Sequence, residues 1–211
     1  MLWSLCWSSV LVLDMLGAYN DPAPLRIIGI DPGTDTLGVS VLDVCLASNR
    51  ISLTAARTHS GSSMAKDYRW LSSVHGDKAA RLRAHEENLF SLFSQFQPHE
   101  IVSEAPYLGR FPSAYAALVE CLNAIRQAVI RYDYRMPLIT VDPPTVKNAL
   151  GVNGKSGDKS LMSRGVQQLI SSGILHNPLG IDVGVLDEHS VDSIAVAYVR
   201  AKYVVDNNTF A

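Results

Sequence analysis

The strongest constraint on the fold of this chain is the order in which its apolar segments follow one another. Three short segments rich in β-branched residues come first, at 26–31, 37–44 and 51–58. Further strands are predicted at 100–104 and 138–142. Helices are predicted at 78–96, from residue 113, at 144–150, at 159–172 and at about 187–205. This order predicts an α/β fold with a mixed five-stranded sheet, whose first three strands form a meander and whose two faces are covered by helices.

The segment at 59–77 has no clear helix or strand period, and we interpret it as a long loop. It combines glycine, serine and basic residues with Tyr68 and Trp70. Loops of this length are usually functional or mobile.

Composition indicates a compact globular chain. Of the 211 residues, 47% are hydrophobic and 18% are charged, and the mean hydropathy is +0.11, which excludes a largely disordered protein. We expect an apolar N-terminal extension over 1–25, one folded domain over 26–205 and a tail over 206–211. The extension has no Lys or Arg before its apolar run, and Asp14 interrupts that run, so we predict neither a membrane span nor an export signal.

The cysteines argue against disulfide bonding. Cys6, Cys45 and Cys121 are far apart, odd in number and without CxxC spacing, so they predict neither a disulfide framework nor a thiolate zinc site. We therefore expect an intracellular protein of a reducing compartment, the cytoplasm or nucleoid, with a phage or organelle origin left open.

Charge is distributed unevenly along the chain. The net charge of −2 argues against a strongly basic nucleic-acid binder. Residues 104–170 nevertheless carry 8 basic and 5 acidic side chains, and the segments on either side are net acidic. This distribution suits an acidic metal site beside a phosphate-binding surface, although a difference of this size also arises by chance.

Two apolar strands end in a carboxylate. Asp31 ends the first strand directly before Pro32-Gly33, and Glu104 ends the strand at 100–104. An Asp before such a turn often bonds only its own backbone. If the two strands are neighbours, however, both carboxylates meet at one edge of the sheet, where a metal or substrate can reach them.

The last predicted helix carries a second acidic group. His189 and Asp192 are spaced i,i+3, and Glu188 and Asp192 are spaced i,i+4, so each pair shares a helix face. Asp187 and Glu188 suit a helix N-terminus without any further function, but Asp192 lies beyond the first turn. His189 is either a ligand or proton carrier, or a solvated residue at the helix start. Hard oxygen donors with at most one imidazole favour Mg²⁺ or Mn²⁺, and two such ions catalyse phosphodiester hydrolysis.

Basic and aromatic residues supply a candidate DNA-binding set. Lys147, Lys155 and Lys159 surround the glycines of 151–157 and could contact phosphates. Tyr107 and Phe111, with Arg110 between them, could stack on bases. The alternatives are a solvated surface loop for the lysines and core or interface positions for the aromatics.

Four ordered blocks resemble the RuvC-like Holliday-junction resolvases of the RNase H-like superfamily. They are RIIGIDPGTDTLGVSV (26–41), IVSEAPY (101–107), PPTVKNALGVNGKSGDK (143–159) and HSVDSIAVA (189–197). The similarity covers roughly residues 26–203, and residues 1–25 and 59–77 depart from it. A turn like that of the first block also occurs in actin-like ATPases, whereas four ordered blocks are more specific.

The resemblance implies an RNase H-like nuclease domain over 26–205 that works as a homodimer. It implies symmetrical paired nicking of four-way DNA junctions with two Mg²⁺ ions per site, or Mn²⁺ in their place. The metal-site residues carried over are Asp31, Glu104, His189 and Asp192, and some members have Asp at the place of His189. Lys147 and Lys155 or Lys159 match basic positions of a DNA-facing loop, and Tyr107 falls where an aromatic inserts at the junction.

Other functions stay open at this point. The same fold could cut other branched DNA or RNA, because fold does not fix substrate. An actin-like kinase or ATPase would need a second domain of similar size. A junction-binding protein without catalysis is the third alternative.

Overall fold

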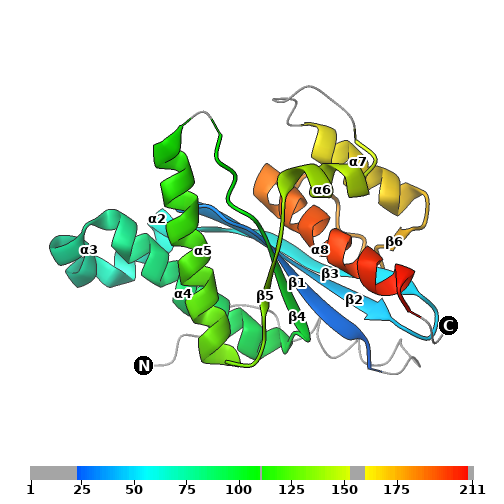
Figure 1. The fold of residues 1–211 in the computed structure, drawn as a ribbon, viewed down its shortest axis with the longest axis horizontal. Coiled ribbons are helices and arrows are strands. Elements are labelled where there is room, and N and C mark those ends of the chain that lie inside the picture. The colour runs from blue at the N-terminus through cyan, green and yellow to red at the C-terminus, as the bar shows by residue number, and fades with distance from the viewer. Residues whose placement is uncertain (1–22, 110, 153–159, 209–211) are drawn as a thin grey trace.

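The computed structural model describes residues 23–109, 111–152 and 160–208. A six-stranded mixed sheet forms its centre, with the strand order β5-β4-β1-β2-β3-β6 (Figure 1). The strands are β1 (Leu25–Asp31), β2 (Thr36–Cys45), β3 (Arg50–Ser60), β4 (Glu100–Glu104), β5 (Leu138–Val141) and β6 (Leu175–His176). The first three strands pair antiparallel as a meander, and β4 and β5 run parallel to β1. The predicted meander and mixed sheet are confirmed.

One strand of the sheet was not expected. β6 contributes Leu175 and His176, which pair in parallel with Ile51 and Ser52 of β3. A two-residue strand is too short for any alternation of apolar and polar residues to indicate it.

Helices cover both faces of the sheet, as predicted. On one face lie α4 (Asp77–Phe96) and α5 (Pro112–Tyr132), and on the other lie α6 (Pro143–Ala149), α7 (Ser160–Ser171) and α8 (Glu188–Asp206) (Figure 1). Side chains along β1 alternate between the two resulting cores: Ile27 packs under α8, and Ile28 and Ile30 pack under α4 and α5. Within the described ranges, none of the helices is both long and apolar enough to span a membrane.

The prediction of a long loop at 59–77 is wrong. β3 continues to Ser60, and three short helical segments follow: α2 (Gly61–Met64), η1 (Ala65–Tyr68) and α3 (Arg69–His75). The Ser60 side chain caps α2 by accepting from the Ser63 amide, and α3 ends at Gly76, whose φ is 86°. Segments of four to seven residues are too short to repeat an apolar stripe, so periodicity could not detect them.

Two glycines allow α8 to lie directly on the sheet. A Cβ atom on Gly38 of β2 would lie 1.9 Å from the His189 carbonyl oxygen, and one on Gly29 of β1 would lie 2.3 Å from the Ser193 carbonyl oxygen. The Ser40 hydroxyl also donates to the Ser193 carbonyl at 2.8 Å. We call this glycine contact of α8 with β1 and β2 the helix–sheet contact; it fixes where His189 and Asp192 stand relative to the strand ends.

Gly38→Ala is expected to destabilise the protein, because the added methyl group would overlap the backbone of α8. Overpacking of this kind costs about 1–3 kcal/mol, which urea unfolding measures directly. Gly109→Ala is the matched control, because no heavy atom lies within 4 Å of a Cβ built there. Equal unfolding free energies for the two variants would contradict the role of the helix–sheet contact.

Candidate active site

The carboxylates of Asp31 and Glu104 lie at the same edge of the sheet. Asp31 is the last residue of β1, and Glu104 is the last residue of β4. The two strands are parallel neighbours, with Ile30 opposite Ser103, so their next residues emerge side by side. Asp31 is only 7% exposed, and Glu104 is half-buried. The sequence-based condition that these strands be neighbours is met.

The start of α8 is fixed against the end of β3. The carboxylate of Asp187 caps the helix by accepting from the Ser190 amide at 3.0 Å, and the Thr58 hydroxyl donates to the same carboxylate. Asp187 therefore serves as the helix cap that the sequence suggested, and Glu188 is exposed in the first turn. This anchoring directs the next residues of α8 toward the ends of β1 and β4.

His189 is bonded on both sides of its ring. Its Nδ1 lies 2.7 Å from Oδ2 of Asp31, and its Nε2 lies 2.7 Å from the Thr36 hydroxyl. The hydrogen bond to Asp31 raises the pKa of His189, and both ring nitrogens have a hydrogen-bond partner. His189 is therefore not a freely solvated residue. Thr36 is the partner that sequence reasoning missed, because a single threonine at a strand start gives no pattern.

The carboxyl groups of Glu104 and Asp192 have raised pKa values. Burial, and then the charges of Asp31 and Asp192, raise the pKa of Glu104 to about 8. Burial, and then the charge of Asp31, raise the pKa of Asp192 to about 7. Burial also raises the pKa of Asp31, against the opposing effect of His189. Three carboxyl groups thus share one half-buried region in which their negative charges are poorly compensated.

This donor set fits a divalent cation in its chemistry. Clustered carboxylates with a neighbouring imidazole are hard ligands, and a positive ion would relieve the repulsion that raises their pKa values. In the described part of the chain, no group of three His, Cys, Asp or Glu side chains already has the arrangement of a metal-binding site.

The predicted DNA-binding residues that the structure describes lie near this edge. Lys147 is exposed on α6, and its charge lowers the pKa of both Glu104 and Asp192. Tyr107 and Phe111, which follow β4, are 64% and 65% exposed, so they are not core aromatics. Arg110, Lys155 and Lys159 lie outside the described residues.

A mixed sheet of this order, with carboxylates ending β1 and β4 and with α8 crossing it, defines an RNase H-like α/β protein.

No family model matches the chain. Curated relatives do match, and they include proteins named crossover junction endodeoxyribonuclease RuvC. The Xanthomonas campestris pv. campestris protein is 28% identical over 177 residues, which are 83% of this chain and 87% of the relative. The Bartonella tribocorum protein is 37% identical over 90 residues, which are 43% of this chain and only 45% of that relative.

A solved structure gives the same result for the fold. The Thermus thermophilus RuvC structure, in complex with a Holliday junction substrate, matches with a TM-score of 0.61 and 19% identity. The match covers 87% of this chain and 97% of that chain. The protein is therefore RuvC-like in fold, and the resemblance stated from its four sequence blocks is confirmed.

Proposed function

We propose that this protein is a Holliday-junction resolvase, a structure-selective endonuclease that hydrolyses opposed strands of a four-way DNA junction. The observation that carries the proposal is the meeting of Asp31, Glu104 and Asp192 at one edge of an RNase H-like sheet, with His189 bonded to Asp31. The names of the bacterial relatives and the junction bound to the Thermus thermophilus protein support the same function.

Asp31, Glu104, Asp192 and His189 are the residues we propose as catalytic and metal-holding. Mg²⁺ suits their oxygen donors best, with Mn²⁺ as an alternative, and we propose two ions per site. Bound there, such ions activate a water molecule and stabilise the leaving oxygen of a phosphodiester. The mutual repulsion of the carboxylates favours the loaded site over the metal-free one.

The protein supplies orientation and a proton-carrying group. The hydrogen bonds to Asp31 and Thr36 hold the His189 ring in one orientation, and its pKa is raised. A ring fixed beside Asp31 is able to take up and release a proton at the sheet edge, and as a metal ligand it would act in its neutral form. The buried position of Asp31 limits the motion of its carboxylate during this exchange.

Residues around this edge provide the proposed contacts with DNA. Lys147 stands close enough to influence two of the carboxylates, so a phosphate bound to it would lie near the reacting position. The exposed rings of Tyr107 and Phe111 offer stacking surfaces for bases at the opened junction centre. Arg110, Lys155 and Lys159 belong to the same proposed set.

Paired nicking requires two sites in one particle. A two-fold homodimer meets this need, because it places one acidic site on each of two opposed strands. We therefore propose that the active species is a homodimer.

A labelled four-way junction, incubated with the protein with and without Mg²⁺ and mapped on all four strands, tests this function. We expect symmetrical nicks on two opposed strands that require the metal and disappear with EDTA. Light scattering in the same buffer should give the mass of a dimer. Three-way and linear duplexes of the same sequence serve as substrate controls. If they are cut equally well, the protein is a nuclease of other specificity, and binding without any nick would leave only a junction-binding role.

A further inference from the structure

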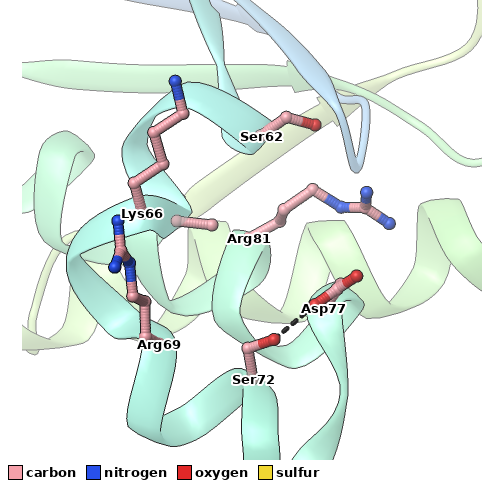
Figure 2. Close-up of a pocket in the computed structure, with 7 residues that line it drawn as sticks. Ser62, Lys66, Arg69, Ser72, Asp77 and Arg81 are labelled. Atoms are coloured by element: carbon pink, nitrogen blue, oxygen red, sulfur yellow. Dashed lines mark hydrogen bonds between the residues drawn. The ribbon is translucent and has the colours of Figure 1, made fainter.

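The helical segment that replaces the expected loop forms a basic pocket. Its lining consists of Ser62, Ala65, Lys66, Arg69, Ser72, Asp77 and Arg81, around about 270 Å³. Figure 2 shows Arg81 extending between Ser62 and Asp77, with Lys66 and Arg69 on the other side of the pocket. The lining residues come from α2, η1, α3 and the first turns of α4, so the pocket depends on the fold of this whole segment.

Cations outnumber carboxylates around this pocket. Asp35 lies near it, because the hydrogen bond from Ser62 and, to a lesser extent, the charge of Arg81 lower its pKa. Among the described residues, Lys66, Arg69 and Arg81 form no ion pair. Asp77 is the acidic residue of the lining, and its carboxylate accepts from the Ser72 hydroxyl. The pocket therefore carries an excess of positive charge that suits an anionic ligand.

Arg81 gives a second, independent indication of a ligand. Its Nε is buried and, within the described residues, has no hydrogen-bond partner. A buried donor without a partner is costly, and a bound anion would satisfy it. Gly61 lets α2 lie close to α4 at this point, because a Cβ built on Gly61 would lie only 3.2 Å from the Arg81 Cβ.

The pocket is at the same edge of the sheet as the acidic site. β1 ends at Asp31 where β2 begins and β3 ends, with Thr36 opposite Ser60. The first residues of α2 are joined to the β1–β2 turn, because the Gly61 amide donates to the Asp35 carbonyl and the Ser62 amide donates to the Asp35 carboxylate at 3.2 Å. Thr36, the next residue, bonds His189. The basic pocket is therefore linked to the proposed catalytic residues through α2 and the β1–β2 turn.

We infer that the pocket of Lys66, Arg69 and Arg81 binds a backbone phosphate of the DNA strand that is cut, close to the cleaved bond. This inference rests on the proposed function, since a phosphodiester at the acidic edge brings the adjoining phosphates of the same strand within reach of α2 and η1. Lysine binds a phosphate as a point charge, and arginine binds it as a fork of donors. The contact positions the strand and reads no base.

The test uses the full-length double variant Lys66→Gln/Arg69→Gln, because both side chains are exposed and their replacement should leave the fold intact. Junction binding is measured without divalent metal at several salt concentrations. Each lost phosphate contact should make the slope of log K against log salt shallower by about 1. The matched control is Arg135→Gln/Lys202→Gln, which removes the same charge from exposed residues before β5 and on the C-terminal half of α8, away from the acidic edge.

A scan of neutral methylphosphonates along the cut strand locates the contact. In the wild-type protein, a methylphosphonate at one position beside the nick should weaken binding, and in the double variant, which keeps Arg81, the same substitution should have a clearly smaller effect. Such non-additivity indicates a direct pairing of the phosphate with the pocket. If the double variant keeps the slope and the methylphosphonate pattern of the wild type while the wild type cuts the junction, the pocket inference is wrong and the resolvase function stands. If the wild type neither binds nor cuts the junction, the proposed function fails as well.

Discussion

Asp31→Asn is expected to reduce nicking of the four-way junction by roughly 100- to 1,000-fold or more, the range measured when one fixed electrostatic group is removed from an active site. The substitution keeps the shape of the side chain but removes the charge that binds His189 and that we propose for metal binding. Strand-mapped cleavage in Mg²⁺ measures the loss, and a gel-shift assay without metal should show that junction binding persists.

The control for this variant is Asp206→Asn. It removes the same charge at the C-terminal end of α8, where Asp206 forms an exposed ion pair with Lys202. Its cleavage rate should equal that of the wild type. Because burial raises the pKa of Asp31, the neutral Asn should not unfold the protein, and thermal unfolding checks this. Cleavage by Asp31→Asn at the control rate would remove Asp31 from the catalytic set.

The metal-free protein is expected to lose stability as the pH rises from about 6.5 to about 8. The pKa of Glu104 rises to about 8 in the folded protein, from an ordinary value of 4.5, and that of Asp192 rises to about 7, from 3.8. Between about pH 6.5 and 8 the unfolded chain has already released these protons while the folded chain still holds them, so increasing pH favours unfolding. Below about pH 6.5, His59 and His85, whose pKa values burial lowers to about 4, act in the opposite direction. For a chain of this size, each 1 kcal/mol lowers Tm by roughly 2–4 °C, so a pH series of thermal unfolding in EDTA detects the effect.

Added Mg²⁺ should offset this loss, and more strongly at pH 8 than at pH 5. At about 100 times its Kd, a ligand of the folded state stabilises by about 2.7 kcal/mol. At pH 5 protons compete for the same carboxylates and the gain should be smaller. Glu104→Gln serves as the matched variant: its stability in EDTA should fall less steeply with pH, and its response to Mg²⁺ should shrink. A wild-type stability that rises between pH 6.5 and pH 8 in EDTA would contradict the crowding of the three carboxylates.

The parts of the fold that could be predicted from sequence are those with a repeated local pattern. The strands of the meander alternate between two buried faces, and α5 repeats an apolar stripe over 21 residues, so both were detectable. The helical segment at 61–75 consists of pieces of four to seven residues, which are stabilised by caps and by packing on α4. Contacts of that kind depend on the three-dimensional arrangement and leave no period in the sequence.

The same distinction applies to the candidate site. Asp31 and Glu104 were predictable because each carboxylate ends an apolar strand, and His189 and Asp192 because they share one helix face. Thr36 and the cations of the basic pocket were not, because their importance depends on which elements meet at the edge of the sheet. Arg81, for example, is separated by 50 residues from Asp31 in the sequence, and only the link between α2 and the β1–β2 turn relates the two.

The helix–sheet contact joins two rigid parts of the site, one on α8 and one on the paired strands β1 and β4. His189 and Asp192 lie on α8 and keep their mutual spacing whatever that helix does, while Asp31 and Glu104 keep theirs through the pairing of β1 with β4. The distance between the halves is set where Gly29 and Gly38 meet the backbone of α8. Small side chains introduced there would therefore act as graded spacers, which separate the two halves without altering any residue of the site.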